Sequence, residues 1–178
     1  MSNEQIQKDK NDHLDNLLKK IVDDFNGRVK IEKEISNVLL KGHLLVENLL
    51  QETLASLDLK GGINRISFYE KVKRLYEFKT NEPIMQSNIK DISPVLFALN
   101  ETRNNLAHNL DFQVSESDVN RIGLNIGSEF VLQKYKTGYS NTRENLLFCL
   151  KYIVHKVGLI MFLRIEELKD KTKKVEKK

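Results

Sequence analysis

The sequence is poor in residues that break helices or cross-link the chain: 178 residues include one cysteine, two prolines and eight glycines. A single cysteine, Cys149, excludes an internal disulfide and a cysteine-rich metal site. So few prolines and glycines leave little material for the many turns of a β-sandwich or β-barrel, and they favour a few long helices. Hydrophobic residues make up 40% of the chain, which is enough for one core.

Signals for a membrane or for export are also missing. The longest unbroken apolar run, Val157 to Leu163, is far too short to span a bilayer. Residues 1–13 are polar and do not resemble a secretory signal. We therefore expect a cytoplasmic protein that makes no contact with a membrane.

The net charge of +4 comes from one end of the chain. Residues 169–178 hold six lysines and two acidic residues, so the other 168 residues sum to zero. A solubilising tail is the simplest interpretation of this segment. Because the body carries no large basic stripe, a polyanion would need a narrow binding groove or the tail itself.

Apolar residues recur every three or four positions through most of the chain, which is the period of an α-helix. This spacing predicts helices at 14–25, 29–57, 67–78, 94–108 and 142–169, and a loop at 79–92. Ser93-Pro94 is typical of a helix start, and Ser115 with Asp118 resembles a capping box that opens a further helix. For residues 123–139 the sequence does not distinguish between strand, loop and helix.

The sequence therefore predicts one all-α domain, a bundle of about five to six helices. We divide it into an N-terminal helix or arm (1–28), a helical domain (29–168) and a basic tail (169–178). The last helix is apolar on two faces, so it is either central to its own core or shared with a second subunit. The two faces are Leu146, Leu150, Ile153, Val157 and Ile160, and Phe148, Tyr152, Leu159 and Phe162.

Motifs for cofactors and metals are nearly absent. Gly61-Gly62 precedes no lysine-serine pair, so no phosphate-binding loop is expected. The four histidines show no spacing of three or four that places two metal ligands on one helix face. Cys149 lies in the apolar last helix, where an inert buried thiol is expected. We expect neither a metal nor a cofactor.

The helix predicted at 94–108 carries the most informative polar residues. Arg103 falls within its leucine stripe, where a guanidinium is costly unless it is paired or faces a wet cavity. Asn100, Asn104 and His108 follow one another at intervals of four, so they share one face. In a structural interpretation, Arg103 pairs with a carboxylate such as Glu47, and His108 caps the helix end. In a functional interpretation, the same residues handle a phosphodiester.

Metal-free RNA cleavage needs the residue types that this helix carries. A base takes the proton of the ribose 2′-hydroxyl, an acid protonates the leaving 5′-oxygen, and cations stabilise the charge on phosphorus. Arginine suits a phosphate, and histidine transfers protons near neutral pH. One histidine cannot easily fill both roles, so a homodimer that brings two copies of the helix together is expected.

The segment Arg103-Asn104-Asn105-Leu106-Ala107-His108 resembles the RNxxxH form of the motif of HEPN domains, and the leucine-rich helix before it fits the HEPN-like bundle. The resemblance implies a catalytic Arg103 and His108, a supporting Asn104, and a homodimer whose two motifs form one composite site. Many HEPN proteins are metal-independent ribonucleases of toxin–antitoxin, phage-defence and CRISPR-associated systems. A branch controlled by tyrosine modification has a tyrosine where this chain has Leu110, so that control is not expected here.

We therefore expect an endoribonuclease that leaves 2′,3′-cyclic phosphate ends and serves as a toxin or phage-defence effector. RNA, a second copy of the chain, and an antitoxin or regulatory protein are the expected partners. Arg103 and His108 are its expected catalytic residues, with Asn104, Asn100 and Glu47 in support. The alternative is a non-catalytic HEPN-like dimer that binds RNA or protein as a regulator, similar to the mannitol operon repressor. A mononucleotide-sensing module is a third possibility.

Overall fold

The computed structural model describes the backbone of residues 3–59, 61–137 and 141–175, and the side chains of residues 12–59, 61–136 and 141–169. The described residues form seven α-helices, one short 3₁₀ helix and no strand, so the predicted all-α class is confirmed. The helices are α1 (Asn3–Val29), α2 (Ile35–Ser56), η1 (Ile63–Arg65), α3 (Phe68–Glu77), α4 (Pro83–His108), α5 (Glu116–Leu124), α6 (Ser128–Thr137) and α7 (Thr142–Val175). Helix α6 lies in the stretch whose structure the sequence left open, and it brings the number of α-helices above the predicted five to six.

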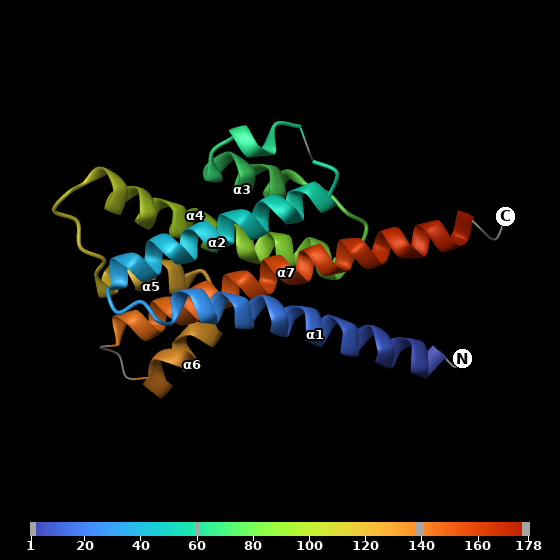
Figure 1. Cartoon of the computed structure of the whole chain (residues 1–178), viewed down its shortest axis with the longest axis horizontal. Helices are drawn as coiled ribbons and strands as arrows, with labels where there is room; N and C mark the ends of the chain where they lie inside the picture. The colour runs from blue at the N-terminus through green and yellow to red at the C-terminus, as the bar shows by residue number, and fades with distance from the viewer. Residues whose placement is uncertain (1–2, 60, 138–140, 176–178) are drawn as a thin grey trace.

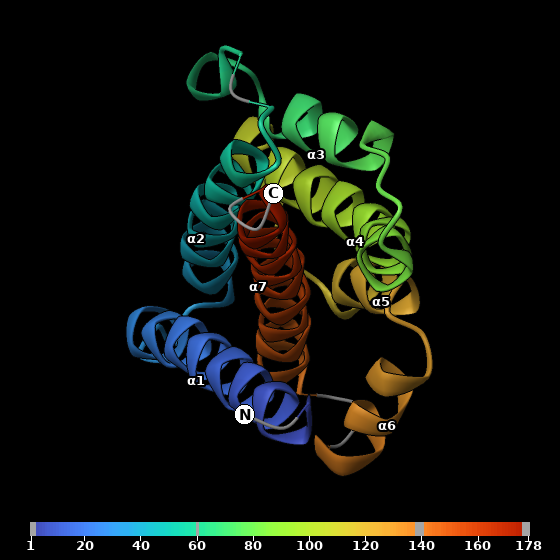
Figure 2. The ribbon, with the colours of Figure 1, turned by 90° about the vertical axis from the view of Figure 1, so that its right-hand side faces the viewer.

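Helix α7 is the centre of the bundle. It contacts α1, α2, α4, α5 and α6, which surround it when the molecule is viewed along its length (Figure 2). Helix α3 lies outside this ring, against α2 and α4 (Figure 1). Helix α1 runs antiparallel to α7 and packs along it, so the predicted N-terminal arm is part of the bundle.

Both apolar faces of α7 are used within the chain. The face made by Leu146, Leu150, Ile153, Val157 and Ile160 is fully buried. On the other face, the ring of Phe148 lies 6.4 Å from that of Phe130 in α6. A Cβ atom at Gly158 would lie 3.2 Å from side-chain atoms of Leu18 and Ile21 in α1. Helix α7 is therefore central to its own core, which is one of the two arrangements that its pattern allows.

Helices α2 and α7 approach each other closely at Gly42. A Cβ atom built on Gly42 would lie only 2.4 Å from Cδ1 of Leu150, which is fully buried and has no room to move. Glycine at this position lets the two backbones meet. The close approach also fixes the position of the next residue, His43, whose side chain is buried.

The segment of α7 from Thr142 to Lys169 is long and apolar enough to cross a membrane, judged by length and composition alone. More than half of its most apolar stretch is buried inside the bundle. The core helix of a soluble protein meets the same criterion. In this fold the hydrophobicity of α7 is explained by its central position.

The start of α4 differs from the prediction. The helix begins at Pro83, so residues 83–92 are helical instead of forming a loop, and Ser93-Pro94 lies inside the helix. Pro83 occupies the first turn, and the Glu82 carboxylate accepts hydrogen bonds from the backbone N–H groups of Ile84 and Met85 in the same turn. Ser93 donates its hydroxyl to the Ile89 carbonyl, so it does not act as a cap. The N-terminal cap of α4 is therefore Glu82, followed by Pro83, and not Ser93 followed by Pro94.

The boundary between the first two helices also differs. Helix α1 continues through Asn26-Gly27 to Val29, and α2 begins at Ile35 instead of at residue 29. Phe25 and Val29 are both buried, so packing of one more turn extends α1 past the glycine.

The capping box at Ser115 and Asp118 is confirmed, since each side chain bonds to the other residue's backbone N–H.

Candidate functional site

The motif identified in the sequence occupies the last two turns of α4, at the end of the bundle where α2 begins (Figure 1). Arg103 is half-buried, and its Nη1 donates a hydrogen bond to Oδ1 of Asn104 at 3.1 Å. Asn104 is half-buried as well, whereas the imidazole of His108 is exposed on the final turn. The structure therefore pairs the guanidinium with the neighbouring amide and leaves the histidine open to solvent.

Arg103 forms no ion pair with a carboxylate among the described residues. This sets it apart from Arg121 on the adjacent helix α5, whose Nη1 lies 2.6 Å from Oε1 of Glu101. A half-buried guanidinium with only an amide partner keeps most of its five N–H donors for an external anion. This arrangement fits the wet-cavity interpretation of Arg103 better than the salt-bridge interpretation.

Glu47 does not pair with Arg103, contrary to the structural interpretation of the sequence. Its Oε1 accepts a hydrogen bond at 2.7 Å from Nζ of Lys71, which reaches it from α3. The Lys71 ammonium is buried and also lies 3.4 Å from Oε1 of Gln51. A buried ammonium needs a charged partner, and Lys71 is closer to Glu47 than the motif arginine is. Glu47 therefore holds α3 on α2.

His108 is the last residue of α4, and the helix ends as Asn109 turns into an extended conformation. The Asn109 N–H bonds to the Asn105 carbonyl, and no hydrogen bond joins the His108 imidazole to a carbonyl of the described chain. The histidine does not cap the helix end through its side chain. The imidazole is exposed to solvent.

His43 joins the motif from α2, which the sequence did not predict. Its imidazole is 5% exposed, stacks on Phe68 with ring centroids 4.3 Å apart, and has an Nε2 atom without a hydrogen-bond partner. Arg103 and Glu47 both lie close enough to influence its charge, and the Asn100 side chain is within hydrogen-bonding reach. A second imidazole of the same chain therefore lies close enough to Arg103 for the guanidinium charge to act on it.

Burial makes the His43 imidazole a weak base. Desolvation lowers the pKa of His43 from 6.5 to about 4; Glu47 opposes this effect, and Arg103 adds to it. The ring is therefore neutral at physiological pH. The neutral imidazole lies within hydrogen-bonding reach of the Asn100 side chain.

The lowered pKa of His43 predicts a pH-dependent stability. Between pH 6.5 and pH 4 the unfolded chain binds a proton that the folded protein excludes, so stability must decrease as the pH falls. We expect the free energy of unfolding to drop by about 2 kcal/mol from about pH 7 to pH 5 through this residue. Urea unfolding at the two pH values measures the drop. His43→Gln should remove it while keeping the smaller effect of His155, and an unchanged slope in this variant would contradict the prediction.

Asn100 and Asn104 line a shallow pocket of about 350 Å³ beside the motif. Its other lining residues are Tyr69, Phe97, Glu101 and Asn105. The rings of Tyr69 and Phe97 are 5.2 Å apart and form an aromatic wall. Tyr69 lies on α3, so no pattern along α4 could have revealed it. The pocket joins an aromatic surface to several amide groups next to Arg103.

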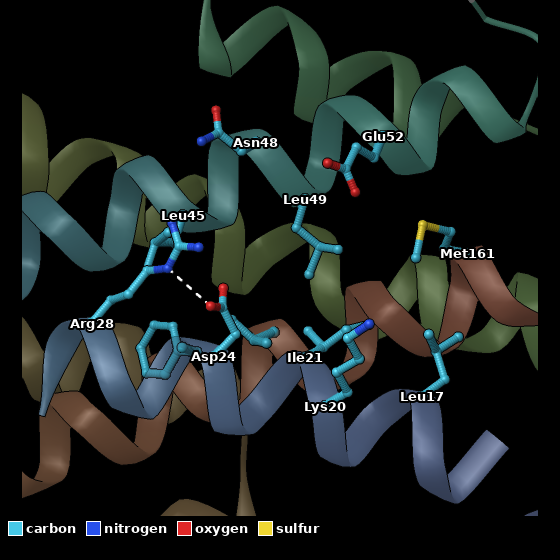
Figure 3. A pocket seen from close by; sticks show the side chains of 12 residues that line it. Leu17, Lys20, Ile21, Asp24, Arg28, Leu45, Asn48, Leu49, Glu52 and Met161 are labelled. Carbon is cyan, nitrogen blue, oxygen red and sulfur yellow. Dashed lines mark hydrogen bonds and ion pairs between the residues drawn. The ribbon is translucent and has the colours of Figure 1, made fainter. Parts of the chain in front are cut away.

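The remaining reactive or hollow regions lie away from the motif. Cys149 is fully buried in α7, and burial raises the pKa of its thiol, so the thiol is inert as expected. Among the described side chains, no group of three or more His, Cys, Asp or Glu residues could hold a metal ion. A groove between α1 and α2 has an apolar floor with Met161 of α7 at one end, and the Asp24–Arg28 ion pair at its rim (Figure 3).

Comparison with known proteins identifies no relative: the chain matches no family model, no curated protein and no solved structure.

Proposed function

We propose that the protein is a metal-independent endoribonuclease of HEPN type, acting as a toxin or phage-defence effector in the cytoplasm. The observation that carries the proposal is the state of Arg103, which is half-buried, free of any carboxylate in the described chain, and bonded to the neighbouring Asn104. A structural arginine on a core-facing line would be expected to have an acidic partner. A guanidinium held ready for a phosphate would not.

The chemistry assigns one role to each side chain. The ribose 2′-oxygen attacks phosphorus as a His108 imidazole accepts its proton, and the bond from phosphorus to the 5′-oxygen breaks. A second imidazolium returns a proton to the leaving 5′-oxygen, so one end carries a 2′,3′-cyclic phosphate and the other a 5′-hydroxyl. Arg103 stabilises the charge on the phosphoryl oxygens, and Asn104 holds the guanidinium in place.

The second imidazolium has to come from a second copy of the chain. With a pKa of about 4, the buried His43 is uncharged near neutral pH and cannot supply this proton. Leu40 and Leu44 are exposed one turn apart on α2, and Leu110 is fully exposed just after the motif. A second copy that covered these leucines would bury apolar surface and bring the two His108 residues together.

End-labelled RNA incubated with the purified protein in excess chelator tests this function. We expect cleavage that survives the chelator and leaves 2′,3′-cyclic phosphate ends. Cleavage that requires added metal ions, or that leaves 3′-hydroxyl ends, would contradict the proposed chemistry. Absence of cleavage with every RNA tested would favour the alternative of a non-catalytic helical dimer that binds RNA or protein. The zero net charge of residues 1–168 favours that alternative, because a nuclease body is expected to attract its polyanionic substrate.

A further inference from the structure

The outer face of α3 carries a stripe of exposed aromatic and basic side chains. Tyr69, Lys73 and Tyr76 follow one another at spacings of four and three, so they lie on one side of the helix. Tyr69 is 54% exposed and Tyr76 is 52% exposed. Lys73 is exposed as well, with no ion pair to a carboxylate of the described chain. Two half-exposed tyrosine rings therefore lie on one side of a ten-residue helix, with a cation between them.

A groove runs beside this stripe, between α3 and α4. The pocket of Tyr69, Asn100 and Asn104 continues into a second hollow of about 470 Å³, which Tyr76, Pro94 and Arg121 help to line. Phe97 and Glu101 line both hollows. The two hollows adjoin at Phe97 and Glu101 and together make up this groove: Tyr76 lines one part, and Tyr69 and Asn104, the hydrogen-bond partner of Arg103, line the other.

The groove has the chemistry of a site for unpaired nucleobases. Exposed rings offer faces on which successive bases stack, and amide side chains bond to the edges of the bases. Asn100, Asn104 and Asn105 supply the amides. Lys73 lies outside the groove, on the turn of α3 between the two tyrosines, where its exposed ammonium is a cation for the backbone. The carboxylate of Glu101 is held by Arg121, which reduces its repulsion of phosphates. Stacked rings of this kind recognise single strands, because the bases of a duplex are already stacked on one another.

We propose that the groove between α3 and α4 binds unpaired bases of single-stranded RNA, with Tyr69 and Tyr76 as stacking platforms. The proposal rests on the proposed ribonuclease function and names its substrate class. The strand enters along α3 and places the phosphodiester beyond the bound bases at Arg103. Cleavage is then expected in unpaired regions, since only there can bases leave their stack.

Binding of a fluorescein-labelled single-stranded RNA of mixed sequence tests this proposal independently of cleavage. The measurements use the His108→Ala background, which the proposed mechanism leaves unable to cut. Tyr69→Ala and Tyr76→Ala should each weaken binding about tenfold or more, and Tyr→Phe at either position should retain it. Tyr135→Ala is the matched control, because Tyr135 is a tyrosine on α6 that is 69% exposed. A duplex of the same sequence should bind less tightly.

The outcomes separate this proposal from the proposed function. In one outcome the wild type cleaves RNA, but Tyr69→Ala and Tyr76→Ala bind RNA as tightly as Tyr135→Ala does. This result would overturn the proposed binding groove and keep the proposed nuclease function. Binding that depends on the two tyrosines, without cleavage by the wild type, would keep the groove and overturn the nuclease. Absence of RNA binding to the His108→Ala protein would overturn the groove. Unchanged circular dichroism spectra and thermal midpoints show that the variants remain folded.

Discussion

Arg103→Ala is expected to lower the rate of RNA cleavage by about 10²–10³-fold, because the guanidinium is the cation that the motif offers to the phosphoryl oxygens. The residue is half-buried and bonds to the Asn104 amide, with no carboxylate partner among the described residues, so its loss leaves no buried carboxylate unpaired. Stability should therefore change little. The cleavage rate is measured on end-labelled RNA in chelator, and the thermal midpoint is measured on the same preparation.

Two further variants sharpen this result. Arg103→Lys keeps a positive charge but loses the planar fork, so it should recover only part of the rate. Arg121→Ala is the matched control, because Arg121 lies on the neighbouring helix and is paired with Glu101. Equal rates for Arg103→Ala and Arg121→Ala would contradict a catalytic role for Arg103.

His108 tests the composite site in the same assay. His108→Ala should lower the rate by about 10²–10⁴-fold, the usual contribution of a general acid or base. If both imidazoles of a dimer serve one site, exchange of subunits between equal amounts of wild type and His108→Ala should give about one quarter of the activity of the same total amount of wild type. About one half would indicate sites contained within single chains.

Glu47→Ala is expected to lower the free energy of unfolding by about 3 kcal/mol or more. Lys71 is buried, and the variant leaves its ammonium with only the Gln51 oxygen at 3.4 Å. An unpaired buried charge is among the costliest defects in a protein interior. Urea unfolding followed by circular dichroism measures the loss.

A double variant distinguishes a structural Glu47 from a catalytic one. Glu47→Leu with Lys71→Met removes both charges and fills the space, so stability should return to within about 1 kcal/mol of the wild type. Because Glu47 bonds to Lys71 and not to Arg103, this double variant should also keep most of the cleavage activity. Restored stability without activity would show instead that Glu47 acts in the site through His43.

Local signals in the sequence account for much of the fold. Ser115 caps α5 as predicted, because a cap depends only on residues within one turn, and Ser67, the first residue of the predicted third helix, is the cap of α3. The start of α4 was missed although a signal was present. Met85, Ile89 and Ile92 are all fully buried and are spaced four and three apart, which already indicated a helix before Pro94. The prediction gave more weight to Pro94 as a helix start than to this spacing, but α4 continues through Pro94.

The residues of the candidate site were likewise predictable from the sequence only where they lie close together along the chain. Arg103, Asn104 and His108 lie within the last two turns of one helix, so their order along the chain alone placed them at the same helix end. His43 comes from α2 and Tyr69 from α3, and each is brought to α4 by packing between helices. Pairings of this kind depend on crossing angles and close approaches such as that of Gly42 with Leu150, which no pattern along the chain encodes locally. Packing between helices also explains why Glu47 pairs with Lys71 and not with Arg103, the partner suggested by the sequence.

The sequence by itself therefore determined the all-α class, the positions of most helices and the polar line on α4, because apolar periodicity, caps and helical spacing act over a few residues. Only the tertiary structure decided that both faces of α7 are covered within the chain, that Glu47 holds Lys71, and that His43 and Tyr69 lie beside the motif. These facts depend on which helices meet and at which residues. That choice is made by the fit of whole surfaces in the core, where close packing allows few alternatives.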